Sequence, residues 1–378
     1  MEKSLYYKKL LECCIYILSV LEVIMIQTTR PPIRIGIVGL GRAGLETHCA
    51  ELDSFPHLYK IVAVCDPIKE RRDQHLTRYP NCRTYRRIED ILDDPDVEMV
   101  DIATRSDEHI THAMQALKTH KWVIVERPLC CDFEEAQLLR AAAIKSGNRL
   151  LVRHNYRYEP EFMLAREMMQ NPLLGEIYDV KMRRGVYERK DDWQTVKRCG
   201  GGAALLHGTA FLDQALEILN TPPVKVWADF KRVASVGDAE DFFRIIVRNL
   251  AGLTVDLEIS GGRIAQEPLF VITGTRGEFR LIPGATEGRI RYLDPNEKQD
   301  RRRSSVRTPP LTSQTPVDQF QWLEKAVPLT KRADAGLTII WEHVYNTIRE
   351  NKPFPIPLDN AIEVLRIISL VKKESLFA

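Results

Sequence analysis

The chain has almost no excess charge of either sign. Its 54 lysines and arginines nearly balance 52 aspartates and glutamates, which leaves a formal net charge of +2 at pH 7. A protein whose main partner is nucleic acid usually carries a clear basic excess, so this balance argues against that class. The run Arg301-Arg302-Arg303 lies in a polar, proline-containing stretch at 295–318. We interpret it as a solvated loop, because a short basic run is usually a solvated surface.

The chain also lacks an apolar run long enough to cross a membrane. The charge-free stretch Cys13–Leu21 is bracketed by Glu12 and Glu22 and is shorter than the ~20 residues that a spanning helix needs. No small-residue cleavage site of a signal peptide follows it. We therefore expect residues 1–32 to be an N-terminal extension, with Met25 as a candidate start that would make the preceding residues non-native. The alternative is a membrane-associating or export segment.

Patterns for metal sites and disulfides are missing as well. The chain has eight cysteines, but it has no C-x-x-C motif and no cysteine–histidine spacing typical of a metal site. This usage favours reduced thiols and a cytoplasmic protein, and we expect no metal ion in the site. The cysteines are Cys13, Cys14, Cys49, Cys65, Cys82, Cys130, Cys131 and Cys199.

The most informative feature that is present is a glycine motif after an apolar run. The run 33–38 leads into Gly39-Leu40-Gly41-Arg42-Ala43-Gly44, which has G-x-G-x-x-G spacing. In such a motif Gly39 allows a tight turn, Gly41 lets the backbone approach a pyrophosphate, and Gly44 lets helix and strand pack closely. The free N–H groups and the dipole of the following helix favour the anion. The motif therefore predicts a dinucleotide site.

The cofactor preference depends on the end of the second apolar run. That run, 61–65, is followed by Asp66, and an acid there can hydrogen-bond the adenosine ribose hydroxyls. A carboxylate repels a 2′-phosphate, so we expect NAD, with NADP as the alternative. Lys69, Arg71 and Arg72 follow closely and would offset the repulsion in part. We expect them to face solvent at the start of the next helix.

The organisation of the chain indicates two domains. A length of 378 residues suits two domains, and the 44% apolar and 28% charged content is ordinary for a soluble globular enzyme. Residues 33–150 alternate strand and helix patterns, which is typical of a doubly wound parallel sheet. Ligands bind such a sheet outside the carboxyl ends of its strands. Thr104 and the segment Glu126-Arg127-Pro128 fall at that edge.

Residues 151–378 have a different texture. Long helices do not separate the later apolar runs, so we expect an open, mostly antiparallel sheet. A helix at 202–219 precedes most of the strands, and the chain ends in amphipathic helices at 334–350 and 358–375. We interpret this part as a substrate-binding and oligomerisation domain. Its expected strands are 177–186, 224–233, 242–247, 253–260, 269–273 and 278–282.

Taken together, these segments resemble the Gfo/Idh/MocA oxidoreductase family, the glucose–fructose oxidoreductase and inositol dehydrogenase group. Glu126-Arg127-Pro128-Leu129 is similar to the family's E-K-P-L segment, and Gly200-Gly201-Gly202 opens what resembles its G-G-G-x-L-x-D-x-G-x-H-x-x-D helix. The resemblance implies an N-terminal Rossmann domain, a C-terminal α/β domain, NAD or NADP, a sugar or cyclitol substrate, and a homo-oligomer built on the open sheet face. The resemblance and the strand ends add these expected cofactor-binding residues: Ala103, Thr104, His109, Glu126 and Pro128.

The sequence departs from the family at three positions. In the family, the lysine of E-K-P and an Asp and a His four residues apart surround the reacting carbon. Here Arg127 takes the lysine position, and Leu206 and Ala210 take the Asp and His positions. A shift of one residue puts His207 in the first position but Phe211 in the second, so the pair is not restored.

Two functions remain open at this stage. The first is a nicotinamide-dependent oxidoreductase acting on a sugar-like or polyol substrate, with Arg127, His207 and Tyr156 as the catalytic candidates. The segment 153–158 also offers His154 and Arg157, and Arg183, Arg184 and Trp193 offer an anionic-substrate pocket. Each of these also has a purely structural interpretation. The second function is a catalytically weak or inactive dinucleotide-binding sensor or scaffold.

Overall fold

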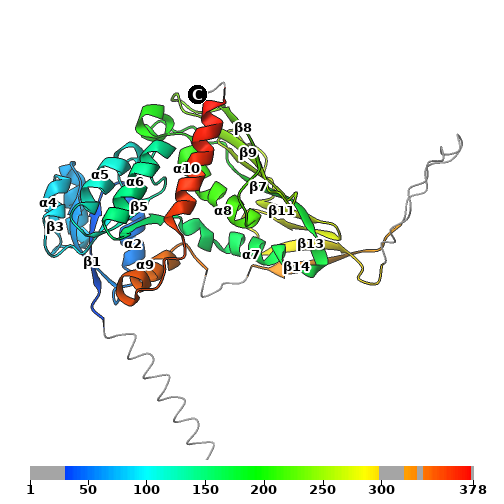
Figure 1. Cartoon of the computed structure of the whole chain (residues 1–378), viewed down its shortest axis with the longest axis horizontal. Helices are drawn as coiled ribbons and strands as arrows, with labels where there is room; N and C mark the ends of the chain where they lie inside the picture. Colours follow the sequence, from blue (N-terminus) through cyan, green and yellow to red (C-terminus); the bar gives the residue numbers. More distant parts are fainter. Residues whose placement is uncertain (1–29, 298–318, 330–334, 376–378) are drawn as a thin grey trace, which may run out of the picture.

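The computed structural model describes residues 30–297, 319–329 and 335–375. These form two β-sheets with helices packed around and between them (Figure 1). Most of the N-terminal extension, the basic run 301–303, Cys13 and Cys14 lie outside the described residues. Within the described part, no helix is long and apolar enough to cross a bilayer.

The first sheet has six parallel strands in the order β3-β2-β1-β4-β5-β6, which is the order of a dinucleotide-binding fold. Its central strands are apolar and almost fully buried, as parallel strands covered on both faces must be. Strand β6 pairs with β5, so the sheet continues past residue 150. The strands are β1 (Ile33–Val38), β2 (Tyr59–Cys65), β3 (Arg83–Tyr85), β4 (Met99–Ile102), β5 (Trp122–Glu126) and β6 (Leu150–Arg153).

Helical segments connect these strands. The first segment, η1, begins within the glycine motif, at Arg42, with π-helical geometry and runs into the short helix α2. Helix α6 starts with an N-cap, because the Asp132 carboxylate accepts the backbone N–H of Glu135. The segments are η1 (Arg42–His48), α2 (Cys49–Leu52), α3 (Lys69–Arg78), α4 (Ile88–Leu92), η2 (Ser106–Glu108), α5 (His109–Leu117) and α6 (Phe133–Lys145).

The second sheet has eight strands in the order β14-β13-β12-β11-β7-β10-β9-β8. All neighbours are antiparallel except β7 and β10, which run parallel. This confirms the expected open, mostly antiparallel sheet. The strands are β7 (Ile177–Gly185), β8 (Lys225–Lys231), β9 (Phe242–Arg248), β10 (Thr254–Ser260), β11 (Phe270–Gly274), β12 (Gly277–Leu281), β13 (Glu287–Leu293) and β14 (Trp322–Pro328).

Strands β13 and β14 were not expected from the sequence. β13 alternates arginines with apolar residues, and β14 is mostly exposed. Neither strand has the apolar run that marked the other strands; β14 forms the edge of the sheet, and β13 lies next to it. The residues between them, 298–318, lie outside the described part.

Helices cover one face of this sheet and leave the other open (Figure 1). Inward side chains such as Val180 and Leu257 are fully buried. On the open face, Asp256 binds two cations, with Arg183 Nη2 at 2.5 Å and Arg244 Nη2 at 2.8 Å. The helical segments of this half are η3 (Asn155–Tyr158), α7 (Pro160–Met169), η4 (Pro172–Leu174), η5 (Trp193–Thr195), η6 (Lys197–Cys199), η7 (Ala204–Gly208), α8 (Thr209–Leu219), α9 (Ile339–Glu350) and α10 (Leu358–Lys373).

The C-terminal helix α9 joins the two halves of the molecule. It packs on the first domain, where Trp341 is completely buried with Ile33 and Tyr59. The Tyr59 hydroxyl donates to the Trp341 carbonyl oxygen at 2.5 Å. Because the last helices return to the first domain in this way, the edge of the first sheet faces the second domain across a cleft.

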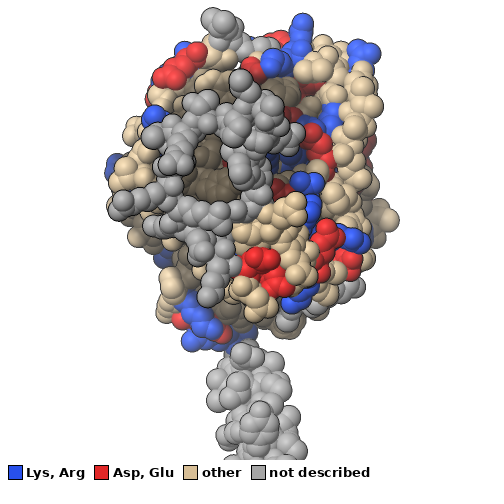
Figure 2. Space-filling view, turned by 90° about the vertical axis from the view of Figure 1, so that its right-hand side faces the viewer, with Lys and Arg blue, Asp and Glu red and all other residues tan. Residues whose placement is uncertain are grey.

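The surface carries charges of both signs. In Figure 2, lysine and arginine side chains are interspersed with aspartate and glutamate over the visible part of one end of the molecule. This mixture agrees with the near-zero net charge of the chain.

Candidate active site

The glycine motif forms the tight turn that the sequence predicts. Gly39 has φ +95°, and a Cβ there would lie 2.7 Å from the Ala103 carbonyl oxygen. A Cβ on Gly44 would collide with the Gly39 carbonyl oxygen. A Cβ on Gly41 would meet no atom within 4 Å, so open space lies over the turn. That space fits the pyrophosphate of a dinucleotide, which needs close approach to this backbone.

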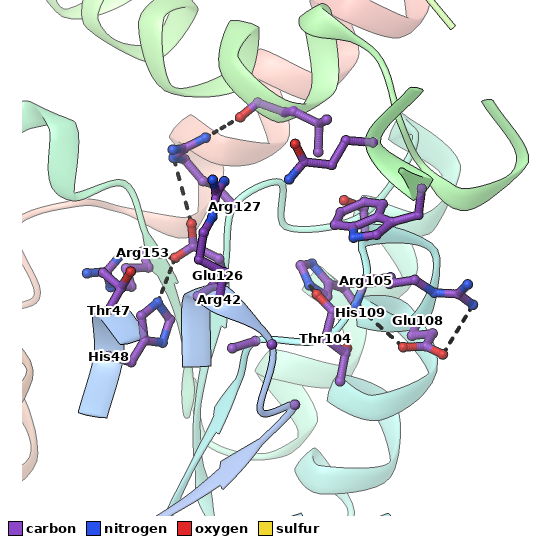
Figure 3. Close-up of a pocket in the computed structure, with 18 of the residues that line it drawn as sticks. Arg42, Thr47, His48, Thr104, Arg105, Glu108, His109, Glu126, Arg127 and Arg153 are labelled. Atoms are coloured by element: carbon purple, nitrogen blue, oxygen red, sulfur yellow. Dashed lines mark hydrogen bonds and ion pairs between the residues drawn. The ribbon is translucent and has the colours of Figure 1, made fainter. Parts of the chain in front are cut away.

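The turn opens into a cavity of about 740 Å³ between the two domains. This is within the usual range for ligand sites. Of the expected cofactor-binding residues, Gly39, Gly41, Arg42, Ala43, Asp66, Ala103, Thr104, His109 and Glu126 line it. Leu40, Gly44 and Pro128 are not among its lining residues and support the loops from behind. Figure 3 shows Arg42 and Thr104 on opposite sides of the opening.

The Asp66 carboxylate is fixed in place by hydrogen bonds and an ion pair within the first domain. Its Oδ2 accepts the backbone N–H of Leu40 at 2.8 Å, and its Oδ1 accepts that of Ile68 at 2.9 Å. Arg71 Nη1 lies 3.3 Å from Oδ2, and Arg72 donates to the Asp66 carbonyl oxygen at 2.5 Å. Arg71 is exposed, as expected, although its guanidinium also contacts Asp66. Arg72 is partly buried, because helix α3 begins so soon after Asp66 that its side chain reaches the Asp66 carbonyl oxygen.

The His109 ring connects two loops of the cavity wall, one after β4 and one after β5. Its Nδ1 lies 2.7 Å from the Pro128 carbonyl oxygen, and its Nε2 lies 3.1 Å from that of Thr104. Burial lowers the pKa of this histidine. A neutral ring has one N–H and so donates to only one of the two carbonyls at a time. His109 thus positions the loops after β4 and β5.

A buried network of charges lies beneath the cavity. His48 is fully buried, with Nδ1 at 2.7 Å from Asp101 Oδ2 and Nε2 at 3.2 Å from Glu126 Oε2. Burial alone would lower the pKa of His48, but the Asp101 carboxylate and the two hydrogen bonds raise it to about 9. His48 is therefore a cation at neutral pH.

Glu126 and Arg153 extend this network towards the second domain. Arg153 Nη1 lies 3.0 Å from Glu126 Oε2, and Arg153 also donates to Glu51. Burial would raise the pKa of Glu126, but Arg153 and His48 hold it far below the usual range. Trp341 Nε1 donates to Glu51 at 2.7 Å. In Figure 3 the labelled members His48, Glu126 and Arg153 lie together at one wall of the pocket.

Arg127 projects from the end of this network into the cleft. Its guanidinium donates to the Leu206 carbonyl oxygen and lies 4.7 Å from the centre of the Tyr156 ring. Its Nε is buried and makes no hydrogen bond within the described part of the chain, and the nearest Glu126 oxygen is 3.8 Å away. The residue lines a cavity that both domains form, so its guanidinium lies close enough to act on a ligand there through its charge.

The helix that carries the other family positions does not start as an α-helix. Residues Ala204–Gly208 form a π-helical segment, η7. In a π-helix residues five apart share a face, and accordingly Leu206 and Phe211 line one neighbouring cavity while Ala210 lines neither that cavity nor the nucleotide cavity. Leu206 and Ala210 therefore do not share a cavity wall.

His207 and Tyr156, the other catalytic candidates, both line the nucleotide cavity. Burial, with the nearby positive charges of Arg127, Lys190 and Arg42, lowers the pKa of His207 to about 3. The imidazole is neutral at physiological pH. It can therefore hydrogen-bond a hydroxyl, but it does not take up a second proton to become a cation. The Tyr156 ring lies between the Arg127 guanidinium and Phe211, at 5.3 Å from the centre of the Phe211 ring.

The remaining candidates divide into lining and structural residues. Trp193 lines the nucleotide cavity and Arg184 lines the neighbouring one. Arg157 makes two hydrogen bonds to Asp213, at 2.6 and 2.7 Å, and His154 Nδ1 lies 3.3 Å from the same carboxylate. Arg183 pairs with Asp256 on the open sheet face and not in the cleft.

Several lining residues were missed by the sequence analysis. Asn155 is 2% exposed and lines the cavity, and its Oδ1 has no hydrogen-bond partner among the described residues. The signal for His48 and Asp101 was present, since Asp101 is a lone acid in an apolar strand and His48 lies four residues after Gly44. No group of three or more metal-ligating side chains occurs in the described ranges.

Comparison with known proteins decides the family. A model of the oxidoreductase family with an NAD-binding Rossmann fold matches residues 33–154, and a model of the GFO/IDH/MocA C-terminal domain matches residues 162–280. The chain belongs to the GFO/IDH/MocA oxidoreductase family. This confirms the resemblance, the Rossmann domain and an NAD or NADP cofactor.

Individual relatives are distant. The chain is 24% identical over 347 residues to a scyllo-inositol 2-dehydrogenase (NADP(+)) of Bacillus subtilis, covering 91% of this chain and 94% of that protein. It is 27% identical over 277 residues to an uncharacterized oxidoreductase of Schizosaccharomyces pombe, covering 71% and 73%. The solved structure of an NAD-binding protein from Listeria innocua has a TM-score of 0.77 and 21% identity, covering 92% and 98%.

The His48 network predicts a loss of stability in alkaline solution. The pKa of His48 in the folded protein, about 9, lies above its unfolded value of 6.5. The stabilisation that protonated His48 gives the folded state is therefore complete below pH 6.5 and is lost as pH rises through 9. The free energy of unfolding should fall by on the order of 3 kcal/mol more across this window in the wild type than in His48→Gln. Urea titrations at pH 6, 7.5 and 9 measure this difference.

The matched control is His57→Gln, which removes an exposed histidine of the same domain. Its pH profile should follow the wild type. A His48→Gln profile that also follows the wild type would show that His48 is neutral in the folded protein.

Proposed function

We propose that this protein is an NAD(P)-dependent oxidoreductase that transfers hydride between the nicotinamide and a CH–OH carbon of a sugar-like or polyol substrate. The observation that carries the proposal is that the glycine turn and Arg127 line one cavity. The cofactor would lie along Gly39–Gly44 and Asp66, with its reactive end towards Glu126 and Arg127. When bound, the nicotinamide supplies or accepts the hydride.

The side chains of this cavity suit binding and charge stabilisation. The Arg127 guanidinium would lie beside the substrate oxygen, where a fixed cation stabilises developing negative charge. Asn155 Oδ1 and the neutral His207 ring hold neighbouring hydroxyls. Tyr156 is the proposed group that exchanges the hydroxyl proton with solvent. This arrangement replaces the family's lysine, aspartate and histidine.

Arg127 provides the direct test of this arrangement. Arg127→Ala should lower kcat/KM for an active polyol or ketose by about 100-fold or more, because one fixed donor to a developing oxyanion is lost. The NADH dissociation constant should change little, since Arg127 is placed beside the substrate oxygen and not beside the pyrophosphate. Absorbance at 340 nm measures turnover, and calorimetry measures NADH binding.

Arg127→Lys is the matched control, because it keeps the charge but loses the planar fork. Its activity should lie between those of the wild type and Arg127→Ala. Unchanged turnover in Arg127→Ala would remove this residue from the site.

A second candidate function is a dinucleotide-binding sensor or scaffold with little catalysis. Two observations favour it, the apolar residues Leu206 and Ala210 at the positions of the family's acid and histidine, and the low pKa of His207. NADH binding without turnover in a wide polyol and ketose screen would support this candidate over the enzyme.

For the cofactor we propose NAD as the preferred form, with NADP also accepted. Asp66 disfavours a 2′-phosphate, while Arg71 lines the cavity and would offset that repulsion in part. Calorimetric titration with NADH and NADPH tests this preference. Asp66→Ser should shift the ratio of the two dissociation constants towards NADPH by about tenfold; an unchanged ratio would contradict the assignment. The Gly41→Val variant, whose side chain fills the space for the pyrophosphate, should bind neither NADH nor NADPH.

We also propose a cytoplasmic homo-oligomer that buries the open face of the second sheet. Trp227 and Tyr178 lie in strands of this sheet and are 53% and 51% exposed. Trp227→Glu should lower the sedimentation coefficient to that of a monomer, because it places a charge in an apolar contact. The same assembly state in Trp227→Glu and in the wild type would exclude this residue from the contact. Leu138→Glu, a change at a residue of α6 in the first domain that is 59% exposed, is the control.

A further inference from the structure

A second cavity opens beside the nucleotide cavity. It has a volume of about 340 Å³ and shares Gln194, Leu206 and His207 with its larger neighbour. Its other walls come from the ends of β7 and β10, from the start of α8 and from the loop between β8 and β9. We call this cavity the side chamber. Because the two cavities share wall residues, a ligand in the cleft can extend a substituent into the side chamber.

The floor of the side chamber is apolar. Ala203, Phe211 and Ile259 line it and are each less than a tenth exposed. Leu206 completes this surface at the position where most family members would carry an acid. A cavity of ~150 Å³ with apolar walls can hold a benzene ring, so the side chamber has room for a group of that size.

The charged groups of the side chamber already have partners. Arg184 Nη2 lies 2.6 Å from Glu159 Oε2, and its guanidinium covers the Phe211 ring at 4.6 Å. The Asp241 carboxylate accepts three backbone N–H groups, at 2.6, 2.7 and 2.7 Å. A charged ligand group would therefore have to displace an existing pair, which favours a neutral one.

The two acids and the lysine nearest the cleft are paired as well. Glu240 accepts the Ala204 N–H at 3.2 Å and lies 3.6 Å from Lys372 Nζ. Lys190 Nζ lies 3.4 Å from Glu188. The neutral polar side chains of Gln194, His207 and Ser235 also line the chamber, and the Ser235 Oγ is buried without a hydrogen-bond partner in the described part.

Exposed apolar side chains gather in the loops around the chamber. Val186, which lines it, is 62% exposed, and Tyr187 next to it is 55% exposed. Val233 lies against Gly262 in the neighbouring loop and is 56% exposed. Val236 and Ile264 in the same loops are 48% and 90% exposed. An apolar entrance of this kind indicates a ligand-binding or interaction surface.

We propose that the side chamber binds a neutral, apolar substituent of the substrate, of about the size of a phenyl ring, while the reacting CH–OH group lies beside Arg127. The proposal rests on the proposed function and narrows its substrate class from free polyols to polyols that carry such a substituent. The paired charges exclude an ionic substituent, and the shared wall at Leu206 and His207 joins the two parts of the ligand.

Benzyl alcohol and glycerol are the probes for this proposal. Both present a CH–OH group, but only benzyl alcohol has an apolar ring. Ligand-observed NMR titration of the full chain, with and without NADH, should give a dissociation constant at least about fivefold lower for benzyl alcohol. Val186→Asp and Leu206→Asp should each weaken benzyl alcohol binding by about fivefold or more, since they place a carboxylate against the ring.

Val224→Asp is the matched control. Val224 is 56% exposed, similar to Val186, but it precedes β8 and does not line the chamber. Its benzyl alcohol affinity should equal that of the wild type. Equal affinity for both probes, no benzyl alcohol binding, or the same loss in Val224→Asp would overturn the proposal.

Two further results separate this proposal from its alternatives. If Val186→Asp dissociates an oligomer in sedimentation but leaves benzyl alcohol affinity unchanged, the apolar loops are a contact between copies of the chain and the proposal falls. If benzyl alcohol binds as expected but calorimetry detects neither NADH nor NADPH, the proposed function fails while the chamber assignment stands.

Discussion

The position of the Glu126 carboxylate is the constraint on which the cleft depends. Its Oε2 contacts both His48 and Arg153, so it joins the helix after the glycine turn to the last strand of the first sheet. A buried charge is tolerated only with close partners, and removal of one partner typically costs ~3–5 kcal/mol. Asp101 and Glu51 complete the pairing, and Glu51 extends it to Trp341 of α9. The same carboxylate therefore fixes the nucleotide turn, the strand ends and the C-terminal helix relative to one another.

Arg127 follows Glu126 directly, so this network also sets where its guanidinium points. A lysine at this position would present one compact charge, whereas the planar guanidinium of arginine carries several N–H donors that point in different directions. Its guanidinium binds the Leu206 carbonyl oxygen in the π-helical segment, and the residue lines the nucleotide cavity. The arginine thus ties the second domain to the first at the point where substrate and cofactor meet. A group that is always charged cannot act as a base, but it holds a fixed positive potential there.

The sequence predicted the parts of this molecule that follow from local periodicity. The parallel first sheet, the glycine turn and the helices at the C-terminus follow from apolar runs and turn residues, and the structure agrees with them. Strands β13 and β14 have weak alternation and could not be recognised in this way. The side chains that close the cleft come from segments far apart, as His48, Arg153 and Trp341 do. Their pairing depends on tertiary packing, which a single sequence does not display.

The helix of the second domain shows why motif spacing alone misleads at this site. Counting in α-helical turns places Leu206 and Ala210 together, but the π-helical segment replaces Ala210 with Phe211 at the cavity wall. The Phe211 ring therefore forms part of the side-chamber wall. The positive charges of Arg127, Lys190 and Arg42 then keep His207 neutral. A site built in this way would lower the energy of a negatively charged substrate oxygen by its electrostatic field, without holding the proton on a histidine.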